Sequence, residues 1–231
     1  MALTADAVLQ EIKNIHKRKP MYGHPLWTGM VEGTFSKEQV KYFCLQHGII
    51  PLHNHNYHGR LYVSCPDPAW RERIAEVAYE EATGRIYANG VGHYKLYLAY
   101  AKAIGISEEE MWSVEYCPSA LGLRLFLSDT CSRFIEGVSA SMLVGEAQVP
   151  GSSGRIARAL KAKFGLSEDE VAFFTVHDTA DGDHSATGID ILERFVKTDA
   201  ERALVLETAR QSNVIRKLMY DEIWEHAQSL R

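Results

Sequence analysis

The chain has 231 residues, which is enough to bury a large apolar core in one or two domains. With 46% hydrophobic and 24% charged residues it has an ordinary globular composition, and its net charge of −5 argues against a general affinity for nucleic acid or anionic membranes. Four dispersed cysteines without a CxxC pair, no apolar run of membrane-spanning length and no signal-peptide pattern lead us to expect a cytoplasmic protein with reduced thiols.

Helix signals begin at the N-terminus. Thr4 is placed to cap a first helix. Ser36 with Gln39 forms a capping box for a second helix that runs to about Leu61. Pro51 falls inside this second helix, so we expect a kink or break there.

Caps and apolar spacing predict helices through the rest of the chain. Asp67 followed by Pro68 opens a helix whose apolar stripe leads to Glu81. The remaining helices are indicated by capping boxes at residues 107–110 and 167–170 and by apolar residues three and four apart over 120–146 and from 200 onward. The sequence therefore predicts one all-α domain over residues 1–231, a bundle of about seven or eight helices.

The strongest local pattern is the segment HDTADGDH at residues 177–184. Offsets of four and seven return to the same face of a helix, so His177, Asp181 and His184 project together. Two imidazoles and one carboxylate on one face suit iron, manganese or zinc. The alternative interpretation is a solvated acidic helix with incidental histidines.

Three further residues fit the same interpretation. Glu81 continues an apolar stripe, where a carboxylate is costly unless it is paired or bound to a metal. Glu146 ends a very apolar helix, and His93 begins an apolar run. The alternative for Glu81 is an ion pair with an arginine or a helix-end charge. For Glu146 it is an exposed position at a helix end, and for His93 it is a core or capping histidine. Together with residues 177–184 these three favour a carboxylate-rich dimetal site inside a helical bundle, with open positions for dioxygen and substrate.

A second group of histidines lies in the segment 47–58. His47, His53, His55 and His58 have no acidic residue near them, since none occurs between Glu38 and Asp67. Surface or pocket histidines are the simplest interpretation. We expect His55 and His58 to line a substrate cavity.

These motifs resemble those of the haem-oxygenase-like dimetal oxidases, relatives of the PQQ-biosynthesis oxidase PqqC, the thiaminase TenA and the chlamydial protein CADD. The resemblance covers nearly the whole chain, and its most specific element is H-x-x-x-D-x-x-H at 177–184. It also includes FSKEQ at 35–39, CPD at 65–67 and EAQVP at 146–150. It implies a haem-oxygenase-like fold, two Fe(II) ions (or Mn), O2 as co-substrate, and the metal ligands Glu81, His93, Glu146, His177, Asp181 and His184.

Departures from the family pattern narrow the expected chemistry. Residues 85–92 are longer than in CADD, so we expect an unwound segment before His93. CADD-like aminobenzoate synthases consume a tyrosine and a lysine of their own chain, and the matching positions here are Trp27 and Leu160. That activity is therefore not expected. Glu81 and Glu146 argue against a metal-free enzyme of the PqqC type.

We therefore predict a non-haem diiron oxidase or oxygenase that cleaves, desaturates or N-oxygenates a small amino-acid-like carboxylate in biosynthesis. A homodimer is expected. Because no G-x-G-x-x-G reductase motif is present, repeated turnover would need either an external reductant or a reaction that returns electrons to the irons. His55, His58 and Arg60 are candidates for binding the carboxylate, with Trp27 or Tyr57 as an apolar wall. The alternatives are a metal-free PqqC-like or TenA-like enzyme, and a non-catalytic interaction or haem-binding protein with His16 as the haem ligand.

Overall fold

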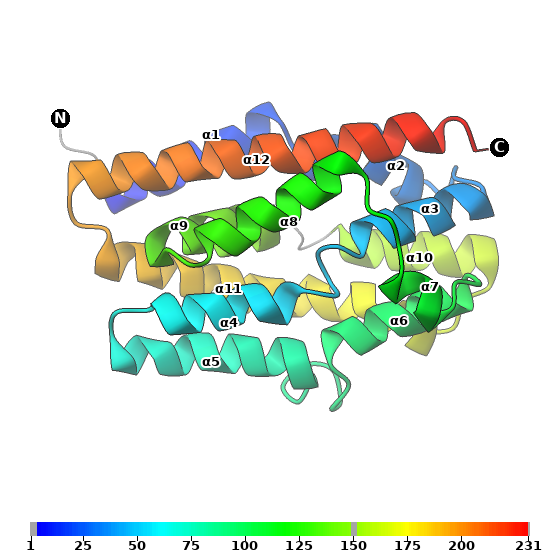
Figure 1. Ribbon diagram of the computed structural model, residues 1–231, viewed down its shortest axis with the longest axis horizontal. Helices are drawn as coiled ribbons and strands as arrows, with labels where there is room; N and C mark the ends of the chain where they lie inside the picture. The colour runs from blue at the N-terminus through cyan, green and yellow to red at the C-terminus, as the bar shows by residue number, and fades with distance from the viewer. Residues whose placement is uncertain (1–3, 149–151, 231) are drawn as a thin grey trace.

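The computed structural model describes residues 4–148 and 152–230, and over these residues it is helical without strands (Figure 1). The all-α prediction is confirmed. Residues 149–151, which complete the EAQVP motif and begin the glycine-rich segment, lie outside the described residues. The α-helices are α1 (Ala5–Arg18), α2 (Pro25–Val31), α3 (Lys37–His47), α4 (Asn54–Ser64), α5 (Pro68–Thr83), α6 (His93–Ala103), α7 (Glu108–Trp112), α8 (Pro118–Thr130), α9 (Phe134–Val138), α10 (Ser153–Phe164), α11 (Ala172–Phe195) and α12 (Asp199–Ala227).

Twelve α-helices in the described chain exceed the predicted seven or eight, because two expected helices are divided and two helices, α2 and α10, were not predicted. The helix predicted from Ser36 to Leu61 separates into α3 and α4 at residues 48–53, around Pro51. The helix predicted over 120–146 is divided at residues 131–133, between α8 and α9. A Cβ on Gly137 of α9 would lie 2.6 Å from Cα of Cys131 in this turn and 2.5 Å from Cδ2 of Leu61. The glycine thus permits a close approach of two chain segments at this turn.

The predicted N-terminal caps account for several helix starts. The side chain of Thr4 accepts a hydrogen bond from the amide of Ala7, and Asp67 accepts one from Ala69. The boxes at Ser36 and at residues 107–110 are both formed. The box at 167–170 is formed as well, but it precedes a short 3-10 turn, η4 (Asp169–Val171), rather than α11 itself.

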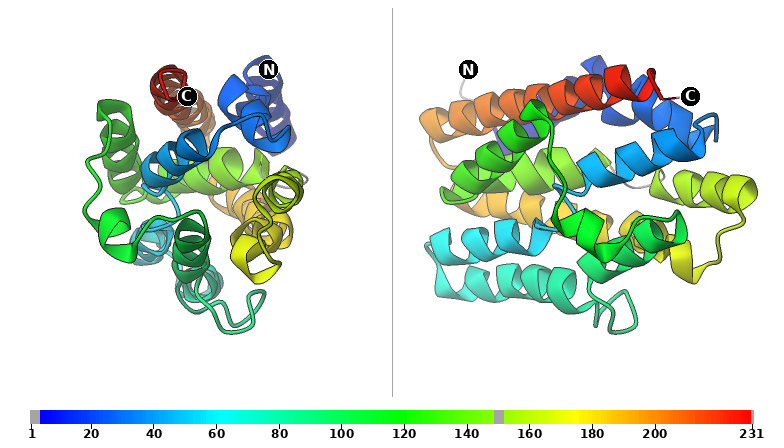
Figure 2. Two further views of the ribbon diagram at one scale, coloured as in Figure 1. Left: turned by 90° about the vertical axis from the view of Figure 1, so that its right-hand side faces the viewer. Right: turned by 45° about the vertical axis from the view of Figure 1, so that its right-hand side comes forward.

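The helices form layers around one contiguous cluster of buried apolar residues. α1 lies along α12 on one side of the molecule, and α4 lies along α5 on the opposite side (Figures 1 and 2). α11 runs between these two pairs and contacts α6, α9 and α10. None of the described helices combines the length and apolarity needed to cross a membrane.

α9 continues into a π-helix, η2 (Ser139–Gly145), and then into a 3-10 turn, η3 (Glu146–Gln148). Both α11 and α12 contact the π-helix. Single π-helical turns occur frequently at functional sites because they shift the direction of the side chains that follow. The residue that follows here is Glu146, one of the predicted metal ligands.

Candidate metal centre

The six predicted ligands come together in the interior of the bundle. Ligand atoms of one trio lie within 4.8 Å of one another, as do those of a second trio. All six residues are at least nine-tenths buried. The first trio is Glu81 at the end of α5, His93 at the start of α6, and His177 on α11; the second is Glu146 of η3 with Asp181 and His184 of α11.

Most of these residues have a ligand atom without a hydrogen bond in the part of the chain that the structure describes. Within residues 4–148 and 152–230, five of the six residues have a buried oxygen or nitrogen that makes no hydrogen bond. Burying such atoms without a partner is costly, and native proteins rarely do so. One metal ion in each trio would provide a partner for all five atoms. The residues present therefore fit the pair of ions that the sequence predicts. The atoms are Oε1 of Glu81, Nδ1 of His93, Oε2 of Glu146, Oδ1 of Asp181 and Nδ1 of His184.

The imidazoles of the first trio are held in fixed orientations. Nε2 of His93 lies 3.1 Å from Oε1 of Glu80, which leaves Nδ1 facing Glu81 at 3.3 Å. Nδ1 of His177 lies 2.6 Å from the carbonyl oxygen of Phe173, so Nε2 is left for a ligand. Carboxylate and carbonyl partners of this kind fix the tautomer and raise the basicity of metal-binding histidines.

Glu80 was not selected from the sequence as a site residue. Its carboxylate also accepts hydrogen bonds from the amides of Ile86 at 2.6 Å and Tyr87 at 3.0 Å. These contacts anchor the connection between α5 and α6, which is unwound as predicted and contains Gly90 at φ 82°. In the sequence, the role of Glu80 is indicated only by its place next to Glu81. Its hydrogen bonds depend on the path of residues 85–92, which the sequence does not specify.

Glu146 has two polar neighbours of its own. Nε2 of His58 lies 3.0 Å from its Oε1 atom, and the hydroxyl of Ser141 donates to the same oxygen at 3.2 Å. His58 is fully buried. The structure therefore brings His58, predicted to bind substrate, against a metal-ligand candidate instead.

The charges in the second trio are strongly coupled. Burial alone would raise the pKa of Glu146, but the imidazoles of His58 and His184 hold it well below its usual range. Burial alone would lower the pKa of His184, whereas Glu146 raises it to about 9. Burial and the charge of Glu146 raise the pKa of Asp181 well above its usual value. Without metal, the trio therefore holds protons that metal ions would displace.

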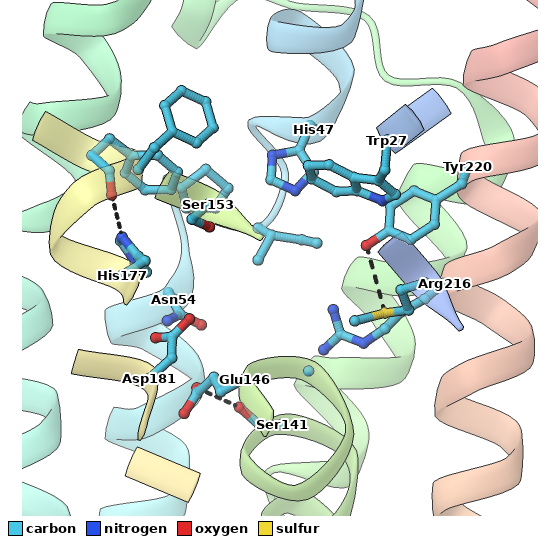
Figure 3. Close-up of a pocket in the computed structure, with 16 residues that line it drawn as sticks. Trp27, His47, Asn54, Ser141, Glu146, Ser153, His177, Asp181, Arg216 and Tyr220 are labelled. Atoms are coloured by element: carbon cyan, nitrogen blue, oxygen red, sulfur yellow. Dashed lines mark hydrogen bonds between the residues drawn. The ribbon is translucent and has the colours of Figure 1, made fainter. Parts of the chain in front are cut away.

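A cavity of about 80 Å³ adjoins the trios (Figure 3). Glu146, Asp181 and His177 line one part of it, and the predicted apolar wall residue Trp27 lines another. Its other lining residues, which the sequence did not indicate, include Arg216 and Tyr220 of α12, His47 of α3, Asn54 of α4 and Ser153 of α10.

The other predicted substrate residues lie elsewhere in the described structure. His55 and Arg60 line a separate surface groove, where Arg60 donates to the hydroxyl of Ser132. The hydroxyl of Tyr57 donates to the carbonyl of Ile49, and Tyr57 does not line the cavity either. The cavity assignment of these residues is corrected, since α4 turns His58 inward and leaves His55 and Arg60 facing the groove. His16, the haem-ligand candidate, is likewise absent from the cavity lining.

Comparison with known proteins shows the family of the chain. The sequence profile of a family described as iron-containing redox enzymes matches residues 41–215, about three quarters of the chain. The chain belongs to this family. The predicted haem-oxygenase-like resemblance is thereby confirmed, and iron is the metal that the family description names.

Curated relatives of this family member carry the name 4-aminobenzoate synthase. The one from Nitrosomonas europaea is 25% identical over 215 residues, which cover 88% of this chain and 85% of the relative. The one from Chlamydia trachomatis is 24% identical over 198 residues, which cover 85% and 84%.

Solved structures agree on the fold. A CADD-like protein from Nostoc punctiforme has a TM-score of 0.77 at 13% identity and covers 96% of this chain and 98% of its own. A TenA homologue from Pseudomonas syringae has a TM-score of 0.77 at 12% identity, covering 95% and 92%. A protein from Shewanella denitrificans with a heme oxygenase-like fold has a TM-score of 0.74 at 18% identity, covering 96% and 91%.

Proposed function

We propose that the chain is a non-haem diiron oxidase or oxygenase that uses O2 to oxidise a small organic substrate. The observation that carries the proposal is the pair of buried trios, each with carboxylate and imidazole atoms within 4.8 Å of one another and beside a cavity. Oxygen and nitrogen ligands of this kind suit iron and manganese. Membership of the iron-containing redox family favours iron.

The proposed ligands are the six residues of the two trios. Two Fe(II) ions bound there would supply the electrons and open coordination positions needed for dioxygen activation. The protein's own contribution is to hold the ligands. Glu80 orients His93, the carbonyl of Phe173 orients His177, and His58 with Ser141 orients Glu146.

The cavity residues bind the substrate and exclude water. Aromatic rings of Trp27, Phe173 and Phe174 form part of the wall. A wall of this kind lowers the local dielectric and strengthens the polar contacts made inside it. The proposed substrate is therefore a small molecule with an apolar part and few polar groups.

The name of the curated relatives raises a second candidate, formation of 4-aminobenzoate. The cavity wall argues against a reaction that consumes a tyrosine and a lysine at the positions matched to those of the relatives. Trp27 occupies the position matched to that tyrosine. Leu160, matched to the lysine, is a buried residue of α10 that does not line the cavity. The tyrosine that lines the cavity, Tyr220 of α12, lies elsewhere in the chain. Within the described residues, no lysine lines the cavity. We therefore propose that the substrate is a small molecule and not a residue of the chain itself. The homodimer stays a prediction.

Metal content tests the proposal. The protein is loaded anaerobically with ferrous ion, freed of excess metal and analysed for iron. About two irons per chain, together with dioxygen uptake that depends on them, is the expected result. Full activity in rigorously metal-free protein would favour the PqqC-like or TenA-like alternative, and a Soret band in the purified protein would favour the haem binder.

A further inference from the structure

The cavity has two chemically different sides. Glu146, Asp181 and His177 of the proposed metal centre occupy one side (Figure 3). Arg216 and Tyr220 of α12 occupy the other. The guanidinium of Arg216 points into the space between them (Figure 3). A molecule in this cavity would therefore contact both a cation and the metal centre.

Arg216 carries a buried charge that has no ion pair among the described residues. The residue is 4% exposed. Within the described chain, none of the ion pairs involves Arg216. Its hydrogen bonds to Ser212 and Ala140 are long, 3.5 Å from Nε to the hydroxyl of Ser212 and 3.4 Å from Nη2 to the carbonyl of Ala140. The hydroxyl of Tyr220 is a further neighbour.

A guanidinium group has five N–H donors in a planar fork, and these contacts leave donors free. Burying a cation without an anionic partner is costly, so a buried arginine of this kind indicates a place where an anion binds. This buried cation lies in a cavity beside the proposed metal centre.

The position of the guanidinium is fixed by the π-helix. A Cβ atom on Gly145 would lie 2.6 Å from Nη2 of Arg216, so the charged head rests directly on the backbone of Gly145. Gly145 precedes Glu146 in the chain. An anion bound to Arg216 is thereby held beside a proposed metal ligand.

We propose that Arg216 binds the carboxylate of a small organic acid, the substrate, with the rest of the molecule directed toward Glu146, Asp181 and His177. This inference deepens the proposed function and rests on it. Arginine binds carboxylates through two parallel hydrogen bonds, which fixes the orientation of the bound acid. The binding residues differ from His55 and Arg60, which the sequence had suggested for the same task.

The cavity favours a monocarboxylate over a phosphate ester. Its volume is about 80 Å³. His47 adds no second cation, because burial lowers its pKa to about 3. One cation matches one carboxylate charge, and the rings of Trp27 and Phe173 offer contact for an apolar or aromatic group.

The test is calorimetric binding to the metal-free protein, so that direct coordination of acids to iron is avoided. The probes are benzoate with benzamide, and L-phenylalanine with L-phenylalaninamide. The variants are Arg216→Met and Arg216→Lys, and the control is Arg210→Met. Arg210 lies on the same helix, is exposed, and pairs with Glu207.

We expect the wild type and Arg210→Met to bind at least one acid at least tenfold more tightly than its amide. Arg216→Met should lose that preference, and Arg216→Lys should retain part of it, because the charge stays and the fork is lost. Equal binding of acid and amide by the wild type, or an unchanged preference in Arg216→Met, would overturn the proposal. If Arg216→Met does not fold, the proposal is tested by the preference of the wild type for the acid over its amide and by the reduction of that preference in Arg216→Lys.

Iron content separates this inference from the proposed function. An acid preference that depends on Arg216 in a protein that binds no iron would refute the diiron enzyme and keep the anion site. Two irons per chain without any acid preference would keep the metal centre and refute the anion site.

Discussion

Nε2 of His58 lies 3.0 Å from Oε1 of Glu146, and both side chains are buried. Neither histidine nitrogen makes a regular hydrogen bond within the described chain. The contact joins α4 to the turn that follows the π-helix. His58 is thus placed to orient the carboxylate that the second trio offers to a metal ion.

Replacement of His58 by glutamine should weaken metal binding without abolishing it. Loss of a residue that orients a metal ligand typically costs 10–100-fold in affinity. Titration of the metal-free protein with Mn(II) measures the change. His53→Gln is the matched control, since His53 lies at the start of the same helix and its side chain makes no capping bond. Equal affinities in wild type and His58→Gln would contradict the orienting role.

Removal of a ligand should have a larger effect. Glu146→Ala and His184→Ala should each keep the fold and bind one iron per chain or fewer, because an open site that loses a ligand loses affinity. Iron analysis with circular dichroism checks both points. The control is Glu193→Ala, an exposed carboxylate on the same helix as His184. Wild-type iron content in both ligand variants would refute the ligand assignment.

Glu80 should stabilise the connection between α5 and α6. Glu80→Ala removes the acceptor of two backbone amides and the partner of His93. Hydrogen bonds to a buried charged group contribute about 1.5–3 kcal/mol each, so the loss of the two amide bonds should lower the free energy of unfolding by roughly 3–6 kcal/mol. Urea unfolding of the metal-free protein measures it.

Hydrogen exchange locates the effect of the Glu80 variant. The amides of Ile86 and Tyr87 should exchange much faster in Glu80→Ala than in the wild type. Glu76→Ala serves as control, because Glu76 is exposed on the same helix. Unchanged exchange at both amides would show that the connection is held by other contacts.

Local patterns in the sequence selected six residues that the structure brings together in the two trios. The spacing of His177, Asp181 and His184 is a property of one helix, and the apolar stripe that leads to Glu81 is a property of another. Helix geometry fixes the relative directions of such residues without knowledge of the rest of the fold. The helix caps at Thr4 and Asp67 depend on equally local contacts and were also predicted correctly.

Features that depend on packing between distant segments were missed. Arg216 lies on α12, where a charged residue in the sequence looks like part of a solvated face, yet it is buried against Gly145. His55 and Arg60 were misplaced because α4 begins anew at Asn54 after the break. A break resets the direction in which the following residues point, and the sequence does not specify the new direction.

Metal binding should release protons near neutral pH. The pKa of His184 is about 9 without metal, held up by Glu146 against the effect of burial, so the imidazole is protonated at pH 7. A ligand imidazole must be neutral, so each binding event at His184 displaces a proton. Affinity should therefore rise with pH up to about 9 and level off above it.

Calorimetry of Mn(II) binding in buffers of different ionisation enthalpy counts these protons. The wild type should release at least one proton per chain at pH 7, and fewer above pH 9. His184→Ala should release fewer at pH 7, because the group that titrates is gone. Affinity that is independent of pH between 6 and 9 would show that His184 is already neutral in the metal-free protein.

Dioxygen consumption should need two ferrous ions and, for repeated turnover, electrons from outside the chain. The sequence carries no G-x-G-x-x-G motif for a flavin or nicotinamide cofactor, and the described structure has no strand to hold one. The iron centre alone holds the electrons for a single reaction with dioxygen. Uptake should therefore stop after about one equivalent per loaded chain when no reductant is present.

An oxygen electrode with anaerobically loaded protein tests this requirement. Ascorbate should allow further uptake in the wild type, while Glu146→Ala with ascorbate should stay at the background of free ferrous ion, since the variant lacks a proposed ligand of the second trio. Intact-mass measurement after the reaction should give an unchanged chain, because the cavity presents Trp27 and no lysine among its described lining residues. A mass change confined to the loaded wild type would instead show that the chain itself is the substrate.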